Sequence, residues 1–137
     1  FVDTDDEIVK TAGMSIPDIF SKYGEEKFRD IESEIIKKVS GMQSAVIATG
    51  GGAILRENNV SLLKENGFVV FIDRPVEKLV TTDDRPLSSN RELLLKRYTE
   101  RYGIYCGAAQ AKIDAADDLQ KNINTVTEVF LNENFSD

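Results

Sequence analysis

Two aspartates near the start of the chain are of a residue type that could take part in catalysis. Asp3 and Asp5 are separated by one residue and follow the apolar residue Val2. At the end of a strand, this spacing would point both carboxylates to one side, with Thr4 facing away. Paired carboxylates in that position can hold a magnesium ion and orient a hydroxyl group. The alternative is a solvated acidic turn or a helix N-cap.

A glycine-rich turn is the second candidate. Thr49-Gly50-Gly51-Gly52 directly follows the apolar run at residues 45–48. The missing side chains would let backbone N–H groups approach a ligand closely, although a purely structural turn would have the same composition. The phosphate-binding pattern G-x-x-x-x-G-K-[ST] does not occur anywhere in the 137 residues, so this turn is not a loop of that kind.

Three arginines on separate predicted elements could bind an anion. Arg29 lies in a predicted helix, Arg85 in a polar loop, and Arg101 near the end of a later predicted helix. Guanidinium groups bind carboxylate and phosphate through two parallel hydrogen bonds. Taken singly, each arginine is typical of a charged surface, so an anion site requires the fold to bring them together.

The composition excludes several classes of protein. The chain has no histidine, which excludes imidazole general bases and histidine metal sites. Seventeen basic residues against twenty-four acidic ones give a net charge of -7, which opposes binding to a nucleic-acid backbone. No apolar run approaches the roughly 20 residues that a bilayer crossing needs, so we expect no membrane partner.

Length and cysteine content indicate a single cytoplasmic domain. A chain of 137 residues lies within the usual range for one domain with one core, and we expect residues 1–137 to form it. The only cysteine, Cys106, cannot form an internal disulfide, which is typical of a reducing compartment. Its alternative interpretation is a small, half-buried apolar residue.

Hydrophobic patterns predict an alternation of strands and helices. Strands are expected at residues 2–4, 45–48, 68–72 and 111–114, and helices at 15–24, 25–41, 58–65, 75–80, 89–104 and 125–132, with a polar loop at 81–90. Ser15 with Asp18, Ser89 with Glu92, and Thr125 with Glu128 have the spacing of capping boxes. The order strand, helix, strand around residues 45–72 predicts a parallel α/β sheet.

Five motifs taken together resemble those of the shikimate kinase family. They are Phe1-Val2-Asp3-Thr4-Asp5, Gly13-Met14-Ser15-Ile16-Pro17-Asp18-Ile19-Phe20, Gly24-Glu25-Glu26-Lys27-Phe28-Arg29 with Glu32, Ala48-Thr49-Gly50-Gly51-Gly52, and Arg85-Pro86-Leu87. Their order and spacing match over the segment from Phe1 to about Asp114. The resemblance implies a three-layer P-loop kinase fold with a parallel sheet in the strand order 2-3-1-4-5.

The resemblance also implies a site for shikimate. Asp5 would hydrogen-bond the ring hydroxyls and act as the base, or orienting acceptor, for the hydroxyl that is phosphorylated. Arg29 and Arg101 would clamp the substrate carboxylate, and Glu32 would support Arg29 from one turn further along the helix. Backbone contacts to the hydroxyls would come from Gly51, and from Gly50 and Gly52.

On the nucleotide side, the resemblance implies ATP as co-substrate and Mg²⁺ as cofactor. Asp3 would reach the magnesium ion, usually through water, and Arg85 would contact the nucleotide phosphates and steady charge during transfer. The first strand of the family and its Walker-type loop should precede Phe1, and they are missing from the sequence. The loop residues 81–84 are Thr-Thr-Asp-Asp, and Asp117-Asp118 stands where a further arginine is expected.

These features define a leading function and its alternatives. We expect an ATP-dependent kinase that phosphorylates the 3-hydroxyl of shikimate in aromatic amino-acid biosynthesis, with the 137 residues inactive alone. A missing central strand would leave two inner strand edges unpaired, so we expect a fragment, or another chain or segment completing the sheet. The alternative function is a nucleotide-incompetent remnant that binds shikimate or a partner. A third is kinase action on gluconate or another polyol.

Overall fold

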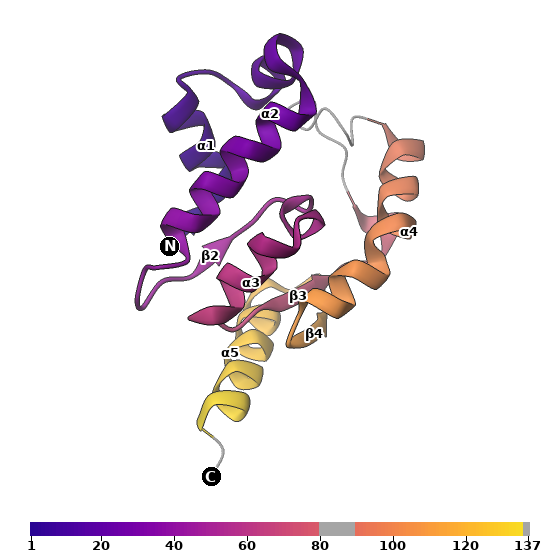
Figure 1. The fold of residues 1–137 in the computed structure, drawn as a ribbon. Helices are drawn as coiled ribbons and strands as arrows, with labels where there is room; N and C mark the ends of the chain where they lie inside the picture. Colours follow the sequence, from indigo (N-terminus) through magenta and orange to yellow (C-terminus); the bar gives the residue numbers. More distant parts are fainter. Residues whose placement is uncertain (80–89, 136–137) are drawn as a thin grey trace.

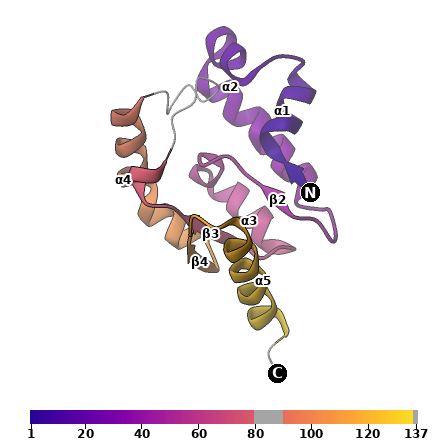
Figure 2. The same ribbon diagram turned by 180° about the vertical axis from the view of Figure 1, so that it is seen from behind.

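Helices and short strands alternate along residues 1–79 and 90–135, the part of the chain that the computed structural model describes. The elements are β1 (Val2–Asp3), α1 (Thr4–Ala12), α2 (Ile16–Val39), β2 (Ile47–Ala48), the 3-10 turn η1 (Ala53–Leu55), α3 (Glu57–Glu65), β3 (Val70–Asp73), the 3-10 turn η2 (Val76–Lys78), α4 (Arg91–Ala108), β4 (Ala111–Asp114) and α5 (Leu119–Phe135). Figures 1 and 2 show α1 and α2 at one end of the molecule, α5 at the other, and β2 and α3 between them.

The strands form two separate parallel pairs. β1 pairs with β2, with Val2 opposite Ile47, and β3 pairs with β4, with Val70 opposite Ala111. Among residues 1–79 and 90–135, no strand joins one pair to the other. In the expected order 2-3-1-4-5 these are the pairs 2-3 and 4-5 with strand 1 absent, so the predicted α/β fold is confirmed. We call β1, β2, α1 and α2 the first half and β3, β4, α4 and α5 the second half.

Helix α2 contains the boundary that the sequence predicts at Gly24. Its N-terminus is capped as expected, because the Ser15 hydroxyl accepts a hydrogen bond from the Asp18 N–H at 3.2 Å. At Gly24 the backbone has φ +82° and ψ 173°, a conformation that side-chain-bearing residues avoid. The two helices expected on either side of Gly24 are therefore segments of one kinked element.

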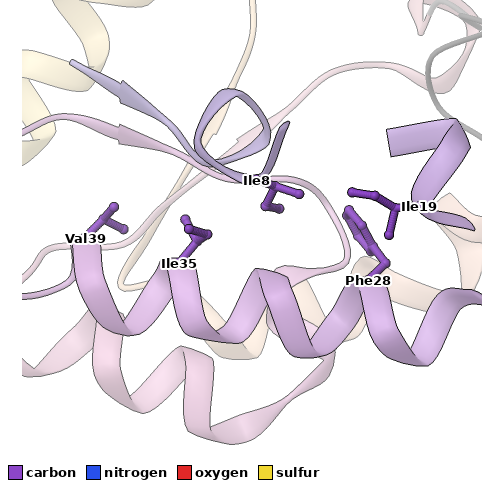
Figure 3. Packing of buried hydrophobic residues seen from close by; sticks show 5 residues of the cluster. All are labelled: Ile8, Ile19, Phe28, Ile35 and Val39. Atoms are coloured by element: carbon purple, nitrogen blue, oxygen red, sulfur yellow. The ribbon is translucent and has the colours of Figure 1, made fainter. Parts of the chain in front are cut away.

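An apolar cluster holds α1 against α2. Ile8 of α1 packs with Ile19, Phe28, Ile35 and Val39 of α2, each at most 5% exposed. Figure 3 shows Phe28, Ile35 and Val39 along one side of α2, pointing towards Ile8. Burying an aliphatic or aromatic side chain of this size contributes about 1.5–3 kcal/mol. The cluster therefore fixes where α1 and its first turn lie relative to α2.

The expected boundaries of several elements are wrong, including those of three helices. Helix α5 begins at Leu119 rather than Thr125, because the Asp118 carboxylate accepts the Lys121 N–H at 2.9 Å and caps it. Helix α4 is capped by Asn90, whose side chain accepts the Leu93 N–H at 2.8 Å; Ser89, the expected cap, lies outside the described residues. The helix expected at 75–80 is only the turn η2 in its described part.

Two further expectations concern the surface. Cys106 is free and exposed, which corrects its interpretation as a half-buried apolar residue. In the described part of the chain, no helix combines the length and the apolar character needed to cross a membrane.

Candidate active site

The two N-terminal aspartates lie where β1 passes directly into α1. The Asp3 carboxylate is the N-cap of this helix and accepts the Asp5 N–H at 2.9 Å. Helix α1 begins at Thr4, which is fully buried, so the expectation that Asp3 and Asp5 share one side of a strand is wrong. The N-cap alternative describes Asp3 correctly. Asp5 lies in the first turn, beside the carboxyl end of β1.

The glycine turn, residues 49–52, lies against two carboxylates. At Gly50, the position that a Cβ would occupy is 3.3 Å from Oδ1 of Asp5 and 3.4 Å from Oε2 of Glu32. β1 and β2 are neighbouring parallel strands, so the residues that follow them meet at one edge of the sheet. The strand pairing therefore explains why Asp5 and the glycine turn are adjacent.

A buried ion pair on α2 lies against the glycine turn. The Arg29 guanidinium donates from Nη1 to Oε1 of Glu32 at 2.7 Å, and Arg29 and Glu32 are 8% and 1% exposed. Burial raises the pKa of the Glu32 carboxyl, an effect that the hydrogen bond and the positive charge of Arg29 oppose. A Cβ at Gly52 would overlap the Arg29 guanidinium, so only glycine permits this close approach.

Arg101 reaches the same turn from the second half. It lies on α4 and is 9% exposed, and its Nη1 is 3.9 Å from the position that a Cβ would occupy at Gly51. Its positive charge also acts on the Glu32 carboxyl, where it lowers the pKa. The structure thus brings Arg29, Arg101, Asp5 and the glycine turn together, which sequence spacing could not show.

Each of the two arginines has a nitrogen without a partner. Among the described residues, neither Nε of Arg29 nor Nη2 of Arg101 makes a hydrogen bond, although both atoms are buried. Leaving a buried donor unsatisfied costs about 1–3 kcal/mol, and more for a charged group. A carboxylate placed between the two side chains would supply the missing acceptor oxygens. The arrangement can therefore bind an organic acid, and the Asp5 carboxylate beside the turn can accept hydrogen bonds from hydroxyl groups.

The nucleotide side is described less completely. Arg85 lies outside the described residues. Within residues 1–79 and 90–135, no group of three or more acidic or cysteine side chains could hold a metal ion. Mg²⁺ in kinases is typically bound by one or two carboxylates together with substrate phosphates and water. A single carboxylate at Asp3 fits that pattern, because one of its oxygens caps α1 and a carboxylate has two oxygens.

Two residues of the site escaped the sequence analysis. Tyr105 donates its hydroxyl hydrogen to the carbonyl oxygen of Gly51 at 2.8 Å, and its spacing of four from Arg101 could have identified it. Asn59, 1% exposed, donates to the carbonyl oxygen of Ala53 at 2.9 Å and secures the turn η1. No pattern in the sequence marks Asn59.

Fold and site together define an α/β protein whose buried arginines and glycine turn lie near the carboxyl ends of the parallel strands β1 and β2. The family model for shikimate kinase matches residues 1–131. A shikimate kinase from Clostridium botulinum (strain Eklund 17B / Type B) is 38% identical over 136 residues, covering 96% of this chain and 82% of the relative. A shikimate kinase from Thermodesulfovibrio yellowstonii is 46% identical over 109 residues, covering 71% and 62%.

Solved structures agree with the sequence relatives. The shikimate kinase from Acinetobacter baumannii in complex with shikimate superposes with a TM-score of 0.91 at 29% identity, covering 99% of this chain and 80% of that one. The enzyme from Aquifex aeolicus gives a TM-score of 0.84 at 31% identity, covering 100% and 84%. The chain therefore belongs to the shikimate kinase family, whose members are ATP-dependent kinases.

Proposed function

We propose that the pocket formed by Arg29, Arg101, Asp5 and the glycine turn binds shikimate for transfer of the γ-phosphate of ATP to its 3-hydroxyl. The observation that carries the proposal is a pair of arginines beside one turn, each more than nine-tenths buried and each with a nitrogen that has no hydrogen-bond partner among the described residues. A buried N–H group without an acceptor is costly, and the shikimate carboxylate supplies acceptor oxygens. The similar protein from Acinetobacter baumannii was solved in complex with shikimate, which supports this choice of ligand.

Each group has a distinct task in this proposal. The arginines hold the substrate carboxylate between α2 and α4, and backbone groups of the glycine turn contact the ring hydroxyls. Asp5 accepts a hydrogen bond from the reacting hydroxyl and takes its proton as that oxygen bonds to the γ-phosphorus, while the bond from the γ-phosphorus to the β-phosphate oxygen breaks and ADP leaves. Glu32 keeps the Arg29 guanidinium in place through their 2.7 Å hydrogen bond.

The nucleotide side of the proposal rests on Asp3, on Arg85 and on family membership. Asp3 would hold Mg²⁺ through water, and the metal would neutralise phosphate charge during transfer. Arg85 would contact the nucleotide phosphates. We place the protein in the cytoplasm, in keeping with its single free cysteine.

Calorimetric titration with shikimate tests the pocket. Arg29→Ala or Arg101→Ala should each weaken binding roughly 10- to 100-fold, the loss expected for a charged hydrogen bond of about 1.5–3 kcal/mol. Arg91→Ala is the matched control, because Arg91 is an exposed arginine on the same helix as Arg101. This variant should bind shikimate with the affinity of the wild type. Equal losses in all three variants would refute the pocket. Titration with gluconate tests the alternative of a kinase for gluconate or another polyol. We expect gluconate to bind more weakly than shikimate.

A further inference from the structure

One hydrogen bond links α4 to the glycine turn. The hydroxyl of Tyr105 donates to the carbonyl oxygen of Gly51 at 2.8 Å, across 54 positions of sequence. In the described residues, the strand pairs of the two halves share no ladder. This bond therefore connects the half that carries Asp5 and Arg29 with the half that carries Arg101.

The ring of Tyr105 is held in place independently of that bond. It packs against Phe71 of β3, with ring centroids 5.0 Å apart and an interplanar angle of 32°. A side chain fixed by ring packing presents its hydroxyl at a defined point, so little conformational freedom is lost when the hydrogen bond forms. The hydroxyl is therefore a rigid support for the turn.

Tyr105 and Arg101 meet the same residue of the turn. The position that a Cβ would occupy at Gly51 lies 2.7 Å from Oη of Tyr105 and 3.9 Å from Nη1 of Arg101. Residues four apart on a helix share a face, so the hydroxyl sets how far Arg101 stands from the turn. Because the peptide group is planar, fixing the Gly51 carbonyl also fixes the direction of the Gly52 N–H.

We propose that Tyr105 is a positioning residue for shikimate, which orients the glycine turn and sets the distance of Arg101 from it. The inference rests on the proposed function of the pocket. It assigns to Tyr105 no contact with the substrate and no part in the phosphoryl transfer itself. Its effect is on the affinity for shikimate alone.

Removing only the hydroxyl tests this role. Tyr105→Phe keeps the ring contact with Phe71 and should weaken shikimate binding roughly 3- to 10-fold, the ratio expected for one neutral hydrogen bond. In steady-state kinetics on a catalytically active parent protein, the KM for shikimate should rise by the same factor, whereas kcat and the KM for ATP should stay within about twofold. Tyr102→Phe is the matched control, because Tyr102 lies on the same helix and its ring also packs on Phe71, with centroids 5.9 Å apart.

A second substitution distinguishes positioning from a general structural effect. Gly51→Ala would place a methyl group 2.7 Å from Oη of Tyr105 but 3.7 Å from its Cζ, which is ordinary contact. Gly51→Ala alone should therefore weaken shikimate binding more than Tyr105→Phe does. In the double variant the clash is gone, so binding should be stronger than in Gly51→Ala.

Three results would overturn the inference. The first is an unchanged affinity for shikimate in Tyr105→Phe. The second is a loss of affinity in the variant with both Gly51→Ala and Tyr105→Phe that equals the product of the two single losses. The third is an equal loss in Tyr102→Phe, which would mean that any change to the aromatic cluster has this effect. A wild-type protein that fails to bind shikimate would refute the proposed function itself, and the positioning role with it, whereas the first three results leave the pocket intact.

Discussion

Replacing Gly52 by alanine should displace Arg29 and leave the backbone in place. A Cβ at this position would overlap Cζ, Nη1 and Nη2 of Arg29. These atoms are the far end of a flexible side chain, so they can move away. The backbone of Gly52 has φ -91° and ψ -5°, which alanine also adopts. The substitution therefore acts on the guanidinium rather than on the fold.

The size of the effect follows from what Arg29 contacts. Its hydrogen bond to Glu32 is lost, as is its proposed contact with the shikimate carboxylate. A hydrogen bond to a charged group contributes about 1.5–3 kcal/mol, so affinity for shikimate should fall roughly 10- to 100-fold. Deleting one partner of a buried ion pair costs about 3–5 kcal/mol. Since Arg29 moves but keeps its charge, we expect a smaller loss in the free energy of unfolding, about 1–3 kcal/mol.

Calorimetry with shikimate and urea denaturation followed by circular dichroism measure the two effects. Gly103→Ala is the control, because Gly103 lies within α4 and nothing is within 4 Å of its Cβ position. That variant should bind shikimate as the wild type does and gain about 0.5–1 kcal/mol of stability from the helix. Wild-type affinity in Gly52→Ala would refute the placement of Arg29 against the turn.

The remaining predictions concern catalysis, pH and capping. Asp5→Asn in a catalytically active parent protein should lower kcat at least about 100-fold with shikimate binding retained; an unchanged rate in a coupled ADP-release assay would remove Asp5 from the mechanism. The 137-residue polypeptide, which has no G-x-x-x-x-G-K-[ST] pattern, should release no ADP in that assay. Because burial raises the pKa of Glu32 above 4.5, the folded chain keeps this proton to higher pH than the unfolded chain. The free energy of unfolding should thus fall as the pH rises from 4.5 through the pKa that Glu32 has in the folded chain. Urea denaturation at a series of pH values should show a smaller dependence of the unfolding free energy on pH in Glu32→Gln. Ser15→Ala removes the cap of α2 and should lower the unfolding free energy by about 1 kcal/mol in thermal melts, with no change in shikimate affinity.

The sequence predicted those elements whose signals are local. The cap at Ser15, the helix boundary at Gly24 and the strand β4 all depend on residues within a few positions of one another. The sequence analysis expects no helix at residues 4–12, where the structure has α1. Its first turn contains Asp5-Asp6-Glu7, and acidic residues in a first turn stabilise a helix N-terminus.

The site was predictable only as a set of residue types. Arg29 and Arg101 are 72 positions apart in the sequence, and their meeting depends on how α4 docks on the turn after β2. The contribution of Tyr105 depends on the same docking. Its spacing of four places Tyr105 on the same face of α4 as Arg101. Its hydrogen-bond partner, the backbone carbonyl of Gly51, lies 54 positions away, so the sequence does not show that contact.

The positions of Arg29 and Arg101 on different helices have a consequence for distant substitutions. Arg29 is carried by α2, whereas Arg101 is carried by α4, which lies against the turn η1 and the glycine turn. In the proposed complex, shikimate would therefore contact both helices at once. A substitution that shifts α4 against the turn should then change the affinity for shikimate even when it leaves both arginines in the sequence.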